Sequence, residues 1–106
     1  MLYIPCSSEH EASTIATSLV QEKLVACCNL IPSVRSFYLW AEAGEEQKLC
    51  EDTEVLLIAK SSQDKFTEIE TRVKELHSYT CPCIVALSIE QVNQEYENWL
   101  NLQIKN

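Results

Sequence analysis

The order of strand-like and helix-like segments constrains this chain more than any other feature. Apolar residues follow helical spacing after Ser8 and again after residues 61–64, and a strand-like run precedes and follows each of these segments. The first helix begins at Ser8, because Ser8 and Glu11 have the spacing of a capping box, and its apolar face extends to Leu24. Pro82 prevents the second helix from continuing into the next strand.

Four strand-like runs complete the pattern, at about residues 2–6, 26–40, 48–60 and 84–89. The apolar run at residues 55–59 is typical of a fully buried central strand. Pro32 lacks a backbone donor and predicts a bulge or bend within the second run. Gly44, the only glycine in the chain, marks a hairpin tip, and Asn93 can cap a last helix.

This order predicts an α+β fold, namely a ferredoxin-like double split βαβ sandwich with an antiparallel sheet and an extra C-terminal helix. Because the chain has 106 residues, of which 46% are hydrophobic, we expect a single domain spanning residues 1–106. The helices would cover one face of the sheet. The other face would stay open in a monomer, so we expect identical subunits to cover it.

The charge balance excludes several classes of partner. The net charge is −8 and no cluster of Lys or Arg exists, so we expect neither nucleic acid nor an anionic membrane as a partner. No apolar run is long enough for membrane insertion, and the N-terminus does not resemble a signal peptide. We therefore expect a cytoplasmic protein whose six cysteines are mostly thiols.

Enzyme motifs are scarce. A single glycine leaves no phosphate-binding loop of the Walker A or GxGxxG kind and no GxSxG elbow, so we do not expect an enzyme. The alternative is a nucleophile–base pair, for which Cys6 with His10 and Cys81 with His77 are the candidates.

Several short segments, in the same order over nearly the whole chain, match the pattern of one family. Residues 22–32 read E-K-L-V-A-C-C-N-L-I-P, similar to E-(K/R)-L-A-A-C-x-N-(L/I)-I-P. Residues 36–40 (S-F-Y-L-W), 58–61 (I-A-K-S) and 77–79 (H-S-Y) are similar to S-x-Y-x-W, I-K-T and H-P-Y. Residues 84–87 and 96–100 match as well. The chain thus resembles the CutA divalent-cation tolerance proteins.

The resemblance implies a tight homotrimer, hairpins that pair across subunits, and a link to copper and other divalent cations as bound metal. It also implies clefts between subunits, similar to the effector clefts of PII signalling proteins. A PII-like regulatory or scaffold trimer that binds a small ligand or a partner protein is therefore the alternative function. Ser78, Cys83 and Ile4 depart from the family, which has proline, glutamate and, in some bacterial members, a copper-linked cysteine at these positions.

His77, Cys81 and Cys83 are the candidate metal ligands, because imidazole and thiolates suit copper and zinc. The alternatives are a histidine that caps the second helix and thiols that are merely buried or exposed. Acidic side chains around the hairpin predict a solvated face, with weak cation binding as the alternative. They are Glu42, Glu45, Glu46, Glu51, Asp52 and Glu54.

Lys60 ends the buried strand, where it either extends into solvent or places a positive charge in an intersubunit cleft. The other candidates for that cleft are Tyr38, Tyr79 and Trp99. Trp40 and Phe37 are the candidates for the trimer interface.

Overall fold

The sheet has the strand order of a double split βαβ fold. A computed structural model describes residues 1–105, so Asn106, the last residue of the predicted domain, lies outside the described residues. Four strands pair in the order β2-β3-β1-β4, each with an antiparallel neighbour, which confirms the predicted fold class. The elements are β1 (Leu2–Cys6), α1 (Glu9–Gln21), β2 (Cys27–Trp40), β3 (Lys48–Lys60), η1 (Gln63–Lys65), α2 (Phe66–Leu76), β4 (Val85–Ala86) and α3 (Gln94–Gln103).

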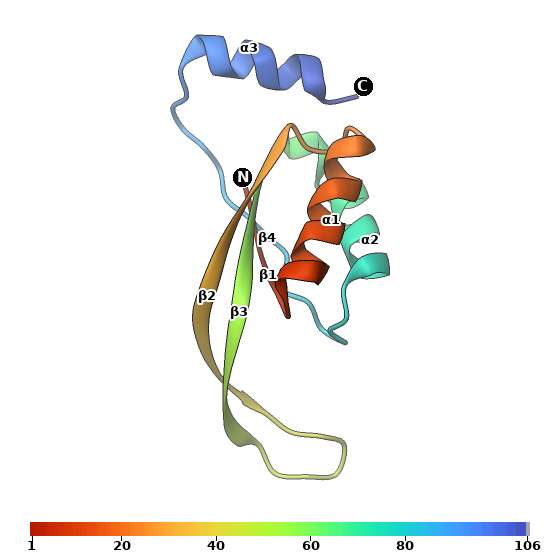
Figure 1. Ribbon diagram of the computed structural model, residues 1–106, viewed down its shortest axis with the longest axis vertical. Coiled ribbons are helices and arrows are strands. Elements are labelled where there is room, and N and C mark those ends of the chain that lie inside the picture. The colour runs from red at the N-terminus through yellow and green to blue at the C-terminus, as the bar shows by residue number, and fades with distance from the viewer. Residues whose placement is uncertain (106) are drawn as a thin grey trace.

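Helices α1 and α2 cover one face of the sheet, as predicted (Figure 1). In β1 and β3, alternate residues point to this face, so Ile4 and its partner Leu57 are both fully buried. Ile15 and Leu19 of α1 and Ile69 of α2 meet them from the helical side. Helical spacing in α1 and α2 and the period of two in the strands therefore supply one common core.

The hairpin of β2 and β3 extends well beyond the helices (Figure 1). Its strands have 14 and 13 residues, longer than the usual five or six. The register shifts between Ile31, which faces Leu56, and Val34, which faces Glu54, so β2 holds one extra residue there. Ser33, next to Pro32, has a φ of 62°, which confirms the predicted bulge.

Before the bulge, the odd-numbered residues of β2 face away from the helices, and after the bulge the even-numbered residues do. Asn29 and Ile31 lie on this open face before the bulge, and Tyr38 and Trp40 lie on it afterwards. The even-numbered residues of β3 from position 50 to 60 share the same face. The bulge thus sets which side chains of the hairpin stand beside one another.

Two local predictions are confirmed only in part. The strand expected at residues 84–89 covers only Val85–Ala86, and its residues are exposed. As an edge strand it pairs with β1 alone, and Leu87 adds two hydrogen bonds with Met1. Asn93 stands at the N-cap of α3, but its side chain makes no capping bond.

Helix α3 lies at the end of the molecule opposite the hairpin tip and has no buried residue (Figure 1). The phenol of Tyr96 contacts Cys27 Sγ at 3.2 Å, and the Lys105 amide donates to the Lys23 carbonyl at 3.0 Å. Within residues 1–105, no helix combines the length and apolar character needed to cross a membrane.

Candidate cation-binding pocket

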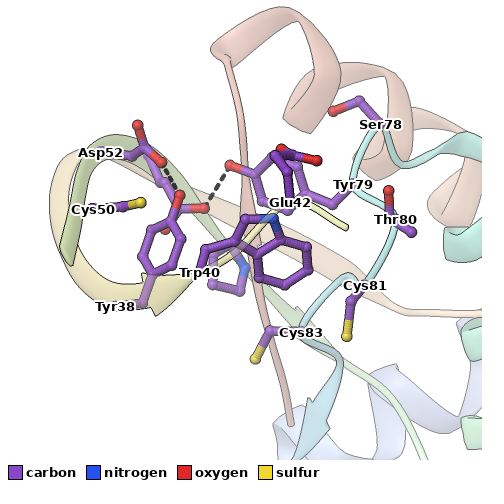
Figure 2. Close-up of a pocket in the computed structure, with 12 residues that line it drawn as sticks. Tyr38, Trp40, Glu42, Cys50, Asp52, Ser78, Tyr79, Thr80, Cys81 and Cys83 are labelled. Carbon is purple, nitrogen blue, oxygen red and sulfur yellow. Dashed lines mark hydrogen bonds between the residues drawn. The ribbon is translucent and has the colours of Figure 1, made fainter. Parts of the chain in front are cut away.

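A pocket of about 630 Å³ lies on the open face, between the hairpin and the loop after α2 (Figure 2). Hairpin side chains line one side, and residues 78–83 of the loop line the other. The lining residues are Pro5, Tyr38, Trp40, Glu42, Cys50, Asp52, Glu54, Ser78, Tyr79, Thr80, Cys81 and Cys83. The fold thus brings together Tyr38 and Tyr79, two of the residues predicted for the intersubunit cleft. It places them beside two predicted metal ligands, Cys81 and Cys83.

Two tyrosines hold the carboxylates of β3 in this pocket. Tyr38 Oη donates to Asp52, and Tyr79 Oη donates to Glu54 Oε2 at 2.7 Å (Figure 2). The bond to Asp52 raises the pKa of Tyr38 to about 12. Burial and the bond to Glu54 raise the pKa of Tyr79, so both phenols stay protonated and donate.

The pocket concentrates negative charge. Glu42, Asp52 and Glu54 line it, whereas no lysine, arginine or histidine does. Within residues 1–105, neither Asp52 nor Glu54 takes part in a salt bridge, although Glu54 is only 7% exposed. By contrast, Glu51 on the opposite face of β3 binds Arg35 at 2.7 Å. Uncompensated carboxylates in a cavity favour a bound cation.

Three thiols add softer ligand atoms. Cys50 belongs to β3, and Cys81 and Cys83 belong to the loop after α2. Burial raises the pKa of Cys83, and nearby Glu54 and Cys81 raise it further, so a metal bound there must displace a proton. Carboxylate oxygen and thiolate sulfur together suit borderline and soft divalent ions.

His77 lies outside this pocket, so the structure does not gather it with Cys81 and Cys83. Its ring is buried, with Nε2 at 2.8 Å from the Pro5 carbonyl and Nδ1 at 3.1 Å from the Tyr79 amide. A carbonyl only accepts and an amide N–H only donates, so Nε2 carries the proton and Nδ1 accepts. Both nitrogens are therefore occupied within the chain.

Another cluster lies behind the pocket. Among residues 1–105, three potential ligand atoms lie within 4.8 Å of one another only at Cys6, Glu11 and His77. Burial and the Glu11 charge raise the pKa of Cys6 to about 12, and its thiol contacts the Ile4 carbonyl. The Glu11 carboxylate is already bonded to Ser7 and Ser78. Each of the three side chains is thus already in contact with other polar groups of the chain.

Neither predicted nucleophile–base pair is formed. Cys6 is hydrogen-bonded to a backbone carbonyl and not to His10, and the nitrogens of His77 are used by Pro5 and Tyr79. Within residues 1–105, no hydrogen bond joins Cys81 to His77.

The remaining predicted cleft residues lie elsewhere. Lys60 lines a second pocket of about 550 Å³ beside α3, where its ammonium lies 5.4 Å from the Tyr96 ring centre. Trp99 packs on Tyr96 at 5.5 Å and does not line either pocket. Trp40 and Phe37, predicted at the trimer interface, are 45% and 58% exposed on opposite faces of β2.

The sequence places Asp52 and Glu54 in an acidic run, for which a solvated face was predicted with weak cation binding as the alternative. The signal that identifies them is the period of two along β3, which aligns them with Cys50 on one face. That face also carries Tyr38, the cross-strand partner of Cys50.

Known proteins resemble this chain in both sequence and fold. A family model described as "CutA1 divalent ion tolerance protein" matches residues 1–103. The divalent-cation tolerance protein CutA of Thermus thermophilus is 43% identical over 100 residues, covering 94% of this chain and 92% of the relative. The chloroplastic CutA of Arabidopsis thaliana is 33% identical and covers all of this chain and 56% of that protein.

Solved structures give the same result. The Thermus thermophilus protein superposes with a TM-score of 0.88 over 98% of this chain and 96% of that one. A structure called periplasmic divalent cation tolerance protein CutA, from Archaeoglobus fulgidus, has a TM-score of 0.90 at 38% identity and covers 98% and 96% of the two chains. These names describe tolerance proteins and not an enzymatic activity. The chain belongs to the CutA1 divalent ion tolerance family.

Proposed function

We propose that the protein is a cytoplasmic homotrimer, built from one domain per chain, that binds divalent metal ions, copper among them, in metal tolerance. It acts as a binding protein and not as an enzyme. The observation that carries the proposal is the pocket on the open face, with three carboxylates, three thiols and no cationic side chain. The names of the relatives, which describe divalent-cation tolerance, support the same class of ligand.

Asp52 and Glu54 supply the charge for a bound ion. Both point to the pocket from one face of β3, and each is oriented by a tyrosine hydroxyl. Ligating carboxylates are commonly held by such hydrogen bonds, which fix the direction of their free lone pairs. A divalent cation would neutralise two charges that the chain leaves uncompensated.

Calorimetric titration of the metal-free protein with Cu²⁺ and Zn²⁺ tests this role. We expect Asp52→Asn to weaken binding by about tenfold or more, because a charged ligand is lost. Glu51→Gln is the matched control, since it removes the same charge from the opposite face of β3. Equal effects of the two substitutions, or no binding by the wild type, would defeat the proposal.

Cys81 and Cys83 are the proposed soft ligands for copper in the same pocket. Both are free and exposed, so their side chains can rotate toward a common ion. His77, the third ligand predicted from the sequence, accepts from the Tyr79 amide at the start of the loop that carries them. Cys27→Ser is a suitable control for Cys83→Ser, because Cys27 lies at the far end of the hairpin, beside Tyr96.

The exposed apolar surface supports the proposed assembly into a trimer. Large apolar side chains are exposed along the hairpin and after β4, a pattern that marks an interaction surface. They include Ile31, Phe37, Leu39, Trp40, Leu49, Leu87, Ile89 and Val92. Identical subunits are the simplest cover for such a surface.

Sedimentation velocity over a dilution series tests the assembly. We expect a trimer at micromolar concentration, and dissociation of Trp40→Ala at concentrations where the wild type stays associated. A wild-type monomer at all concentrations would refute the proposed assembly.

The second pocket supports the alternative, a PII-like trimer with a small-molecule ligand or a partner protein. Lys60 has no salt bridge within residues 1–105 and shares this pocket with Tyr96 and apolar Leu87 and Leu100. A small anion with an apolar body fits this chemistry. Loss of a metabolite's thermal stabilisation in Lys60→Gln, with metal binding intact, would favour this function.

A further inference from the structure

Two side chains fix the start of the loop that reaches the pocket. Ser78 N–H donates to Glu11 Oε1 at 2.5 Å, and Tyr79 N–H donates to His77 Nδ1 at 3.1 Å. Both acceptors lie behind the pocket, where Glu11 belongs to α1 and His77 directly follows α2. The loop therefore leaves the helical layer with its first two amides bound.

His77 also contacts β1, the strand beneath the pocket. Its Nε2–H donates to the carbonyl of Pro5, a pocket residue on β1, at 2.8 Å. Its ring packs on the Tyr79 ring with 4.7 Å between centres. The side chain of His77 is 0% exposed, so no solvent-facing lone pair is available for a ligand.

Tyr79 connects His77 to a carboxylate of the pocket. Its amide is held by His77, its ring by the His77 ring, and its hydroxyl donates to Glu54 at 2.7 Å (Figure 2). Glu54 is nearly buried, and its charge has no ionic partner within residues 1–105. Tyr79 thus links the His77 ring to the Glu54 carboxylate.

We propose that His77 is a positioning residue for the cation pocket, acting through Tyr79 on the Glu54 carboxylate, and that it is not itself a metal ligand. The proposal rests on the proposed function for the identity of the ion. The contacts that define the positioning role are independent of any ion. The two parts are therefore tested separately.

Amide hydrogen exchange in the metal-free protein tests the positioning. His77→Asn keeps an oxygen acceptor near the place of Nδ1, whereas His77→Gln keeps a donor near the place of Nε2 and loses that acceptor. We expect the Tyr79 amide to be protected in the wild type and in His77→Asn, and to exchange at least tenfold faster in His77→Gln. Equal exchange in the two variants would overturn the proposal.

A double-mutant cycle on Cu²⁺ affinity tests the route through Tyr79. Removing a group that orients a metal ligand costs about 10-fold to 100-fold in affinity, so we expect such a loss in both His77→Gln and Tyr79→Phe. Because His77 acts through Tyr79, the double variant should bind no more weakly than Tyr79→Phe alone. Tyr3→Phe is the control, since the Tyr3 hydroxyl makes no hydrogen bond within residues 1–105 and lies outside the pocket.

Multiplicative losses in the double variant would overturn the proposal and make His77 an independent contributor. Zn²⁺ titration followed by the ¹⁵N shifts of the His77 ring gives a direct check, because ligation changes the shift of the coordinating nitrogen. We expect neither nitrogen to shift strongly, and a large shift at Nδ1 or Nε2 would identify a ligand. If the wild type binds no metal, the proposed function fails, while the exchange result still decides whether His77 positions Tyr79.

Discussion

The Glu11 carboxylate provides the sharpest test of how this fold is held together. Its Oε2 accepts from the Ser7 amide at 2.8 Å and the Ser7 hydroxyl at 2.7 Å, and its Oε1 accepts from the Ser78 amide at 2.5 Å. One side chain thereby joins the end of β1 to the loop after α2. Its side chain is only 11% exposed, so water cannot easily replace these bonds.

Glu11→Gln removes one of the two acceptor oxygens and the charge. Hydrogen bonds to charged groups contribute about 1.5–3 kcal/mol each, so we expect a loss of about 2–3 kcal/mol in the free energy of unfolding. Glu9→Gln is the control, because Glu9 lies in the same first turn and makes no side-chain hydrogen bond within residues 1–105. It should cost about 0.3–1 kcal/mol through the helix dipole alone.

The pH dependence provides a second check on Glu11. Burial opposes ionisation, but the bonds from Ser7 and Ser78 lower the pKa of Glu11 from 4.5 to about 2. A lowered carboxyl pKa means that the stabilisation is complete above the unfolded pKa and is lost as the pH falls through the folded one. The difference between wild type and Glu11→Gln should therefore shrink as the pH falls from 4.5 toward 2.

Urea unfolding followed by circular dichroism measures both effects. All variants are compared at one subunit concentration, because association changes the apparent stability. A Glu11→Gln variant no less stable than Glu9→Gln would refute the reasoning. A stability difference that does not change between pH 7 and pH 3 would refute it as well.

Four further substitutions test the fold by the same urea measurement. Leu57→Ala, at a fully buried position, should lower the free energy of unfolding by about 2–5 kcal/mol. Leu102→Ala, at a side chain that is 80% exposed, should lower it far less. Equal losses would contradict the assigned core. Ser8→Ala removes the acceptor of the Glu11 amide and should cost about 1 kcal/mol; an unchanged midpoint would argue against the cap. Lys23→Gly should raise the free energy of unfolding by up to about 1 kcal/mol, because Lys23 follows α1 with a φ of 60°, which glycine adopts without strain. A loss of stability would show that the Lys23 side chain matters more than its backbone.

The sequence predicted the architecture well where a local pattern decides the structure. The Ser8 side chain caps α1, as the spacing to Glu11 indicated. The Glu11 carboxylate reaches back to Ser7, one residue before the cap, and also binds Ser78. The Ser78 amide lies 67 residues away in the chain, so no local pattern could reveal that contact.

The short β4 strand has a similar physical explanation. An apolar run at residues 84–89 favours a buried strand, but burial needs cover on both faces and a neighbour on each edge. Within residues 1–105 this segment has β1 as its only neighbour in the sheet, and pairing ends after Ala86. The apolar side chains beyond it, Leu87 and Ile89, remain exposed.

The candidate site was harder to predict, because it depends on register. The role of His77 follows from a carbonyl on β1, a contact that spans 72 residues of sequence. Asp52 and Glu54 stand in a run of acidic residues, and only pairing with β2 separates them from Glu51 on the opposite face. Residue types thus pointed to the thiols, the tyrosines and the acidic run, whereas strand pairing was needed to separate the carboxylates of the pocket from the rest of that run.

The extra residue at Ser33 constrains how the length of this chain can evolve. Deleting Ser33 would restore regular pairing without turning either strand, because Ile31 would still face Leu56 and Val34 would still face Glu54. A deletion between Val34 and Tyr38 that kept the bulge would instead shift every residue beyond it by one position and exchange the two faces of the outer strand. We therefore expect the loss of one codon to be accepted at the bulge but not farther along β2, and other changes of length to accumulate at the hairpin tip near Gly44.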